Sequence, residues 1–396
     1  MDIELRKNID WVGYVDWTVR DFHSFNTKRG ATYNAYLVRD EKTALIDTVK
    51  TPFAERLLKN VSALTDLEKV DYVICNHAEP DHAGSLPEIM EALPKAVLVC
   101  DKKCEAALGR YFDTSKWKFQ IVADGESLSL GKRTLQFILT PMLHWPESMF
   151  TYVPEEKLLF SMDGFGQHVA SSARFDDEVD MAQVMEEAKA YYANIIMPFG
   201  KQVAATLEKA ASLDIDMIAT SHGVIWRSHL DTIINAYKDW LVCKPTAKVL
   251  VIFDSMWDST GQMARAIIEG ASMPGVEVKL IHVRKSSLTA IATEVLDAAT
   301  VAFGSSTLHR GMMPMMGAVL TYFKGLRPSG KAGFAFGSYG WGKGAPEAIH
   351  VSLEEMGWEV MREPIKAQYR PSPEVLDTCR EAGAMLAEKA KTLAAR

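Results

Sequence analysis

The chain has 396 residues, of which 48% are hydrophobic and 24% are charged, and its formal net charge is -7. This length predicts two domains, and the composition is typical of a soluble globular protein. The negative charge argues against nucleic acid or an anionic membrane as the main partner. No apolar run approaches the roughly 18 residues that a membrane helix needs, so we expect no transmembrane segment.

The N-terminal segment and the cysteines both indicate a cytoplasmic protein. Residues 1–6 are charged from the start, unlike a signal peptide. The cysteines are odd in number and form no Cys-x-x-Cys pair, which fits a reducing compartment and provides no Cys₄ iron site. They are Cys75, Cys100, Cys104, Cys243 and Cys379.

The first quarter of the chain predicts a β-hairpin, a helix and a short buried strand. Residues 32–38 and 43–49 have strand composition on either side of Asp40-Glu41. Residues 52–64 have helical spacing, with Thr51 as the expected N-cap. Residues 73–75 are too short an apolar run for a helix and predict a strand. Pro80 and Gly84 then predict a turn instead of a regular element.

That turn carries the densest group of metal-binding side chains in the sequence. His77, Glu79, Asp81 and His82 fall within six residues, directly after the buried strand. A lone His–Glu pair is usually part of a solvated surface. Four such side chains crowded together after a buried strand repel one another electrostatically, and a cation removes that repulsion. We therefore predict a metal site.

Strands and helices continue to alternate up to residue 245. We expect two sheets sandwiched between helical layers. The predicted helices cover residues 86–93, a segment ending near 111, 178–193 and 198–212, and the predicted strands cover 96–100, several runs between 119 and 160, and 216–220.

Three further positions complete the predicted metal site. His144, Asp163 and His222 each follow an expected strand. A single histidine at a strand end is more often structural, but three such positions beside a four-ligand loop favour ligation. Seven ligands are too many for one metal, so a bridging Asp163 would divide them between two cations. The carboxylate of Glu79 makes the site harder than an imidazole-rich zinc pair and favours iron.

The second half predicts a doubly wound α/β domain with a parallel sheet. A boundary near residues 239–248 divides the chain into domains of residues 1–246 and 247–396. Apolar, largely continuous strands indicate a sheet buried on both faces, whose ligand binds at the carboxyl ends of the strands. The expected strands are 249–253, 278–283, 300–303 and 332–336, and the expected helices are 260–271, 288–296, 313–323 and 345–355.

Three polar loops follow strands of this second sheet. Residues 254–261 place hydroxyls before a helix, which predicts an anion-binding cradle, although a simple helix N-cap is the alternative. The loop has no lysine at the P-loop position, so a nucleoside triphosphate is not expected. Residues 304–308 and 337–342 supply matching loops, with aromatic side chains suited to a flat ring.

Residues 30–245 resemble a metallo-β-lactamase-type αββα sandwich, and residues 249–396 resemble a flavodoxin. The combination resembles the flavodiiron proteins, on the motifs His77-x-Glu79-x-Asp81-His82, His144-Trp-Pro, Asp163-Gly-Phe-Gly and Ser221-His-Gly. The resemblance implies two irons, one held by His77, Glu79 and His144, the other by Asp81, His82 and His222, with Asp163 bridging.

The same resemblance implies FMN bound by the three loops of the second domain. The sequence departs from the usual flavodoxin wording at Ser306 and at His309-Arg310. The implied contact residues are Ser255, Met256, Trp257, Asp258, Ser259, Thr260, Ser306, Thr307, Leu308, Ser338, Tyr339, Gly340, Trp341 and Gly342.

The function implied is reduction of O₂ to water, of NO to N₂O, or both, with electrons relayed through FMN from a carrier such as rubredoxin. A head-to-tail homodimer or homotetramer is expected, because in this family the flavin of one copy serves the irons of another. His23 and His168 are expected near the metal pocket, and Trp145 and Phe165 as its apolar walls. The alternatives are a dizinc hydrolase and a non-enzymatic flavin electron carrier.

Overall fold

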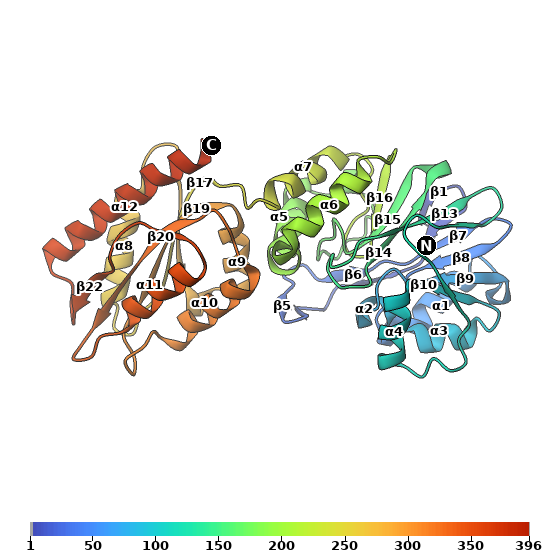
Figure 1. Ribbon diagram of the computed structural model, residues 1–396, viewed down its shortest axis with the longest axis horizontal. Helices are drawn as coiled ribbons and strands as arrows, with labels where there is room; N and C mark the ends of the chain where they lie inside the picture. The colour runs from blue at the N-terminus through green and yellow to red at the C-terminus, as the bar shows by residue number, and fades with distance from the viewer. Residues whose placement is uncertain (1–2, 396) are drawn as a thin grey trace. The chain divides into compact units, whose positions relative to one another are not determined.

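The computed structural model describes residues 3–395, which form two compact units (Figure 1). The first unit comprises the chain up to Tyr191 together with Phe199–Tyr237. The second comprises Tyr192–Pro198 and the chain from Lys238 onward. The chain therefore leaves the first unit briefly, returns to it, and then builds the second unit.

The first unit contains a seven-stranded mixed sheet in the order β1-β2-β7-β8-β9-β10-β11. The strands from β8 to β11 are parallel, and the remaining pairs are antiparallel. Its strands are β1 (Ile3–Arg6), β2 (Ile9–Trp11), β7 (Tyr36–Arg39), β8 (Thr43–Ile46), β9 (Val70–Ile74), β10 (Val97–Cys100) and β11 (Phe119–Ile121). Two small hairpin-like pairs lie outside it, β3 (Tyr14–Asp16) with β6 (Ala31–Tyr33) and β4 (Asp21–Phe22) with β5 (Phe25–Asn26).

A second sheet of the same unit has five strands in the order β12-β13-β14-β15-β16. Only its last pair, β15 with β16, is parallel. β13 and β15 both run antiparallel to β14, so the carboxyl ends of β13, β15 and β16 lie at one edge. The strands are β12 (Ser127–Ser129), β13 (Thr134–Leu139), β14 (Met149–Val153), β15 (Leu158–Met162) and β16 (Met217–Thr220).

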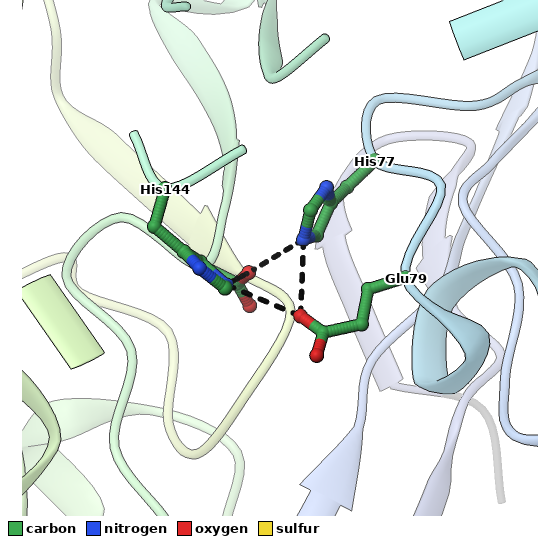
Figure 2. A group of neighbouring side chains, drawn as sticks. His77, Glu79 and His144 are labelled. Atoms are coloured by element: carbon green, nitrogen blue, oxygen red, sulfur yellow. Dashed lines mark hydrogen bonds and ion pairs between the residues drawn. The ribbon is translucent and has the colours of Figure 1, made fainter. Parts of the chain in front are cut away.

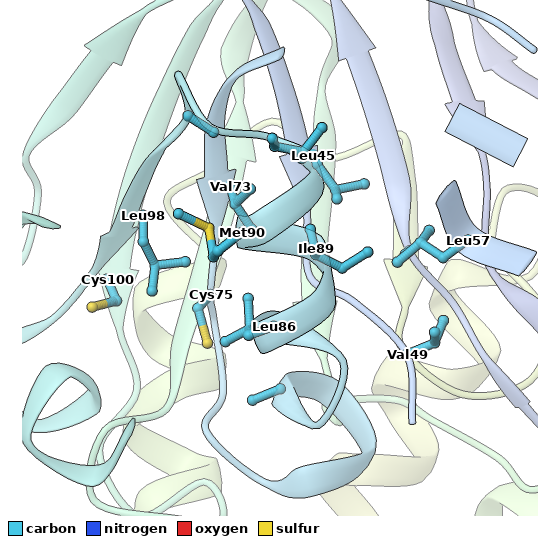
Figure 3. Packing of buried hydrophobic residues seen from close by; sticks show 14 of the residues in the cluster. Leu45, Val49, Leu57, Val73, Cys75, Leu86, Ile89, Met90, Leu98 and Cys100 are labelled. Carbon is cyan, nitrogen blue, oxygen red and sulfur yellow. The ribbon is translucent and has the colours of Figure 1, made fainter. Parts of the chain in front are cut away.

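The two sheets and their helices enclose separate apolar layers, as expected for an αββα sandwich. Tyr72 and Ile74 of β9 belong to a cluster shared with Phe137 and Phe160 of the five-stranded sheet. Val73, which points the other way, packs with helix residues such as Ile89 (Figure 3). The helices are α1 (Ala54–Ser62), α2 (Pro80–Ala83), α3 (Leu86–Ala92), α4 (Lys102–Tyr111), α5 (Met181–Tyr191), α6 (Gly200–Ala210) and α7 (Leu230–Trp240).

The start of two elements differs from the sequence-based prediction. Thr51 does not cap α1: residues Thr51–Phe53 form a 3₁₀ turn, and α1 begins at Ala54. The prediction of a turn at Pro80 was wrong, because Pro80–Ala83 form the short helix α2. Proline is favoured at the first helical position, where its missing N–H leaves no helical hydrogen bond unmade. The predicted hairpin is confirmed for β7 and β8, which pair antiparallel.

The second unit is built on a six-stranded parallel sheet with β18, β17, β19, β20 and β21 in that order and β22 also beside β20. β17 and β19 are almost fully buried, whereas the edge strand β18 is partly exposed. This explains why the apolar pattern of β18 is the least continuous. The strands are β17 (Thr246–Asp254), β18 (Glu277–His282), β19 (Ala298–Ser305), β20 (Ala332–Tyr339), β21 (Glu359–Val360) and β22 (Ile365–Gln368).

Helices cover both faces of this sheet (Figure 1). α8 and α12 pack together on one face, where Ile267 and Leu386 join Val251 and Phe334 of the sheet in one apolar cluster. The helices are α8 (Ser259–Ala271), α9 (Leu288–Asp297), α10 (Pro314–Leu326), α11 (Ala345–Glu355) and α12 (Pro373–Ala394). The parallel sheet with helices on both faces is the predicted doubly wound arrangement.

Over residues 3–395, none of the helices combines the length and the apolar character needed to cross a membrane. The remaining short turns of helix are Leu67–Lys69, Pro154–Glu156, Asp176–Glu178, Met197–Phe199 and Val283–Lys285, all 3₁₀, and the π-helical turn Tyr192–Ile196.

Candidate functional site

The seven predicted ligand residues converge at the carboxyl ends of four strands of the first unit. Their side chains belong to two clusters of closely spaced metal-binding atoms, and a third group joins Glu79 and Asp81 to the exposed His23. His77 and Glu79 lie between β9 and α2, Asp81 and His82 in α2, His144 between β13 and β14, Asp163 directly after β15, and His222 two residues beyond the end of β16. The two sheets of the sandwich thus contribute to the same site.

The first cluster contains His77, Glu79, His144 and Asp163. Figure 2 shows the two imidazoles and the Glu79 carboxylate pointing toward a common centre. Glu79 Oε2 lies 3.2 Å from Nε2 of His77 and 3.2 Å from Nε2 of His144. The Oδ2 atom of Asp163 lies 3.3 Å and 3.2 Å from the same two nitrogens.

The second cluster contains Asp81, His82 and His222. Asp81 Oδ2 lies 3.1 Å from Nε2 of His222 and 3.4 Å from Nε2 of His82. The other oxygen of Asp163, Oδ1, lies 3.0 Å from His82 Nε2 and 3.3 Å from His222 Nε2. Each oxygen of Asp163 therefore faces a different cluster.

Neighbouring backbone and carboxylate groups fix the orientation of the imidazoles. His222 Nδ1 lies 2.7 Å from the carbonyl oxygen of Thr32, so this nitrogen donates and Nε2 is left for the site. Gly223 follows in a left-handed conformation (φ 82°), and a Cβ atom there would lie 1.8 Å from Oε1 of Gln167. A side chain at this position would push His222 out of place.

The chemistry and spacing of the two clusters fit a pair of cations. Asp81 and Asp163 are buried, and their carboxylate oxygens face imidazole nitrogens of the site at 3.0 to 3.5 Å. Buried carboxylates are costly without a compensating charge. Two ligand atoms about 2.1 Å from one ion and at right angles around it are about 3.0 Å apart. The observed spacings of 3.0 to 3.4 Å match that arrangement.

The electrostatics of Asp163 agree with this arrangement. Burial alone would raise the pKa of its carboxyl group, but the imidazoles of His82, His144 and His222 outweigh burial and hold that pKa well below its ordinary value. The carboxylate is therefore ionised and available as a ligand to both sides at neutral pH.

Two further histidines lie beside the clusters, as expected from the sequence. His23 Nδ1 lies 2.7 Å from Glu79 Oε1, and its Nε2 lies 3.5 Å from Asp81 Oδ2. Burial lowers the pKa of His23, but hydrogen bonds with Asp81 and Glu79 raise it to about 9. His168 is buried, its ring centroid is 5.2 Å from that of His222, and neither of its ring nitrogens has a hydrogen-bond partner among residues 3–395.

Aromatic side chains surround these polar groups. The Trp145 ring meets His77 edge-on, with centroids 5.1 Å apart, and the Phe22 ring lies 4.6 Å from His168. Phe165 is buried and packs against Tyr237 at a centroid distance of 4.6 Å.

The structure also reveals two residues beside the site that sequence reasoning missed. Glu147 Oε1 lies 2.8 Å from Nδ1 of His77 and accepts a hydrogen bond from the backbone N–H of Ala78 at 3.1 Å. Tyr191, at the end of α5, is buried with its ring 4.9 Å from that of His168. Glu147 follows His144 by three residues, so its acidic side chain near a predicted ligand was a usable signal. Tyr191 has no local signal.

The predicted loops of the second unit also converge. Thr260 Oγ1 lies 3.0 Å from Ser306 Oγ and 2.9 Å from Ser338 Oγ, and all three residues are buried. Ser255 is buried as well, and its hydroxyl has no hydrogen-bond partner within the described chain. The strand β20 extends to Tyr339, so Ser338 and Tyr339 lie on the strand end and not in the following loop.

The other predicted cofactor-binding residues differ in whether their side chains are exposed or already paired within the chain. Trp257 and Trp341 are 85% and 94% exposed, so their rings are available to a ligand. Asp258 differs: its carboxylate is bound by both terminal nitrogens of Arg265, at 3.1 and 2.5 Å, and the pKa of Asp258 is lowered by that pairing. Ser259 begins α8, Met256 is exposed, Thr307 and Leu308 follow β19, and Gly340 and Gly342 flank Trp341.

Comparison with known families divides the chain as the fold does. Residues 31–223 match the family described as ODP family beta lactamase, and residues 251–383 match the flavodoxin family.

Full-length relatives share both parts. A nitric oxide reductase from Moorella thermoacetica is 44% identical over 392 residues, covering 98% of each chain. The flavodiiron protein from Giardia intestinalis superposes with a TM-score of 0.97 at 40% identity, covering 100% of this chain and 98% of the other. The rubredoxin oxygen:oxidoreductase from the anaerobe Desulfovibrio gigas gives 0.97 at 36% identity, covering 100% of both chains. The chain therefore belongs to the flavodiiron protein family.

Proposed function

We propose that this protein is an oxidoreductase that reduces O₂ to water, NO to N₂O, or both, at a pair of irons. Electrons reach the irons through FMN from an external carrier such as rubredoxin. The observation that carries the proposal is the placement of Asp163, whose Oδ2 faces one cluster of ligand atoms and whose Oδ1 faces another. Hydrolysis at a metal pair needs no flavin unit, whereas redox chemistry needs an electron carrier.

The proposed ligand sets follow the two clusters. One iron would be held by His77, Glu79 and His144 and the other by Asp81, His82 and His222, with Asp163 shared between the two sets. When bound, the iron pair supplies the electrons that reduce the diatomic substrate. Three carboxylates and four neutral imidazoles form a donor set that suits iron in both its ferrous and ferric states.

The remaining side chains of the pocket position and protect the substrate. Trp145 and Phe22 provide apolar walls that favour a small neutral diatomic over water. His168 offers ring nitrogens that no described residue occupies, so it can bind the substrate by a hydrogen bond. His23 lies against Glu79 and Asp81 and orients both carboxylates through its two nitrogens. We assign His23 and His168 to substrate and ligand positioning.

We assign FMN to the three loops at the carboxyl ends of β17, β19 and β20. The N-terminus of α8 and the hydroxyls of Ser255, Thr260, Ser306 and Ser338 suit a phosphate and a ribityl chain. Trp257 and Trp341 present aromatic faces for the isoalloxazine ring. Because the Asp258 carboxylate is paired with Arg265, its contact with FMN would use the backbone. We propose that the remaining FMN contacts are made by the other residues that the sequence analysis names.

Assembly, location and domain boundary belong to the same proposal. We propose a head-to-tail homodimer or homotetramer in which the flavin of one copy serves the irons of another, as the family resemblance implies. A cytoplasmic location is supported by the cysteines, which are all free and buried. We keep residues 1–246 and 247–396 as the two domains.

The test uses the purified full-length chain. We expect about two irons and one FMN per chain, and anaerobic consumption of O₂ or NO when a reduced carrier is supplied. His144→Ala should abolish this activity, whereas His350→Ala on α11 should preserve it. Zinc without flavin would instead identify a dizinc hydrolase. Bound flavin with no consumption of either gas, and no effect of His144→Ala, would identify an electron carrier.

A further inference from the structure

His77 of the first cluster and His222 of the second differ in the group that faces their Nδ1 atom. His77 Nδ1 faces the Glu147 carboxylate at 2.8 Å, whereas His222 Nδ1 faces the neutral backbone carbonyl of Thr32 at 2.7 Å. Both histidines direct Nε2 toward Asp163, at 3.3 Å in each case. The two imidazoles are therefore alike in geometry but unlike in the charge behind them.

The position of Glu147 directs its carboxylate toward His77. Its side chain is 3% exposed, and its Oε1 atom accepts from both His77 Nδ1 and the N–H of Ala78. An ionised carboxylate only accepts hydrogen bonds, so Nδ1 carries the proton and the Nε2 lone pair faces the site. Glu147 also lies three residues after His144, on the same loop, and so ties the positions of two ligands of one cluster together.

A carboxylate that is hydrogen-bonded to an imidazole affects both the imidazole and the metal that the imidazole binds. It fixes the tautomer and raises the basicity of the nitrogen that binds the metal. A more basic ligand stabilises Fe(III) relative to Fe(II), because the higher charge gains more from it. A neutral carbonyl also orients the imidazole, but it raises the basicity of the metal-binding nitrogen less.

We propose that Glu147 is a positioning residue that lowers the reduction potential of the iron held by His77, Glu79 and His144, so that this iron is oxidised before its neighbour. The inference rests on the proposed diiron function. With iron bound at this position, Glu147 would keep the proton on His77 Nδ1 in both oxidation states of the metal. The electron that this iron gives to the substrate would be replaced through FMN.

The test compares wild type with Glu147→Gln by a redox titration of the iron pair, followed by EPR and Mössbauer spectroscopy. Glutamine keeps the shape and an acceptor oxygen but removes the charge. We expect one of the two one-electron steps to move to a higher potential, by about 59 mV for each tenfold loss of preference for Fe(III). The other step should stay in place. Iron affinity should fall roughly 10- to 100-fold at the changed position.

Two further variants separate the hydrogen bond from general effects. Glu147→Asp keeps the charge, so its potential should lie between those of wild type and Glu147→Gln. Asp47→Asn removes another buried carboxylate beneath the same loop, one that binds the N–H and the Nδ2 of Asn76 at 2.8 and 3.0 Å. Asp47 interacts electrostatically with His82 of one cluster and His77 of the other, so this variant should not raise the potential of the His77 iron alone.

The outcomes distinguish failure of this inference from failure of the proposed function. Wild-type protein that binds no iron would overturn the function itself. Iron-loaded Glu147→Gln with unchanged potentials, or with both steps shifted equally, would overturn the role of Glu147 alone. A one-sided shift of the same size in Asp47→Asn would also overturn that role. Should Glu147→Gln fail to fold, Glu147→Ala also removes the charge, and unchanged potentials in that variant would likewise contradict the proposal.

Discussion

His82 Nε2 lies 3.0 Å from Asp163 Oδ1, the shortest contact that this carboxylate makes with an imidazole of the site. His82 belongs to α2, in the region after β9, whereas Asp163 directly follows β15 of the other sheet. The imidazole of His82 is buried, and its Nε2 also lies 3.4 Å from Asp81 Oδ2. This position agrees with the proposed role of His82 as a ligand of the second cluster.

Replacing His82 should remove the iron of the second cluster and leave the iron of the first cluster in place. We expect His82→Asn to retain about one iron per chain, because its amide is a weaker ligand than imidazole and the first cluster is untouched. Metal analysis after gel filtration measures the stoichiometry, and Mössbauer spectroscopy shows which of the two sites remains. Retention of both irons at wild-type affinity would mean that His82 is not a ligand.

Asp163→Asn should affect both positions together. The amide keeps the size of the side chain but loses the charge and one of the two oxygens that face the clusters. We expect less than one iron per chain, measured by the same metal analysis.

Asp176→Asn is the matched control for a buried aspartate of the same unit. Asp176 is buried and accepts hydrogen bonds from the backbone N–H groups of Arg227, Ser228 and His229, away from the ligands. This variant should lose about 1–3 kcal/mol of stability and keep its iron. An equal loss of iron in both variants would show that the loss reflects misfolding and not the missing bridge.

Metal removal should destabilise the first unit. Without cations, the buried carboxylates of Asp81 and Asp163 lose a compensating charge. A ligand that binds only the folded state raises stability by mass action, so chelation should lower the thermal midpoint, and added iron should restore it. Hydrogen exchange of β9 and β15 reports on this unit specifically. Identical protection with and without metal would argue against a metal pair at this place.

Thr260→Val should weaken FMN binding. The substitution removes the hydroxyl that links Ser306 and Ser338 and replaces it with a methyl group of similar size. A hydrogen bond to a charged group contributes about 1.5–3 kcal/mol, so the dissociation constant of FMN should rise roughly 10- to 150-fold. Fluorescence titration of the apoprotein with FMN measures it.

Thr300→Val provides the comparison for a buried threonine in the same sheet. Its hydroxyl donates to the carbonyl of Leu386 on α12, at 3.2 Å, and not to the hydroxyl cluster. FMN affinity should remain unchanged. If the two valine variants bind FMN equally well, the hydroxyl cluster does not contact the cofactor.

The packing of α3 should control how firmly the metal loop is held. Ile89 is fully buried between α3 and the sheet (Figure 3). We expect Ile89→Val to cost about 0.5–1.5 kcal/mol and Ile89→Ala about 2–5 kcal/mol of unfolding free energy. Ile121→Val makes the same chemical change at a residue that is 37% exposed, and should stay within about 0.5 kcal/mol. Proteolysis kinetics of the first unit would measure these losses of stability. A larger loss for Ile121→Val than for Ile89→Val would contradict the prediction.

The convergence of the proposed ligands was predictable because each one follows a recognisable strand. An apolar run such as residues 158–162 and the polar residue after it are adjacent in sequence, so the pattern and its place in the fold go together. The course of the chain at Pro80 was not predictable in the same way. Proline both ends helices and begins them, and α2 forms because the N–H groups of Ala83 and Gly84 reach the carbonyls of Glu79 and Pro80.

Contacts between segments that are far apart in the sequence could not be predicted from local sequence patterns. Glu147 meets His77 across 70 positions of sequence, and the partner of His222 is a backbone carbonyl, which any residue would provide. The extension of β20 to Tyr339 depends on pairing with β22, which lies more than twenty residues further along the chain. Tyr191 likewise reaches the pocket only through the position of α5. These are properties of the assembled structure.

The ligands come from both sheets of the sandwich, and the first and last of them, His77 and His222, enclose most of the first unit in the sequence. A nascent chain therefore holds no complete set of donors until translation has passed β16. Iron insertion must follow assembly of the sandwich, so the ion that is captured depends on which metals the cell supplies to an already folded protein.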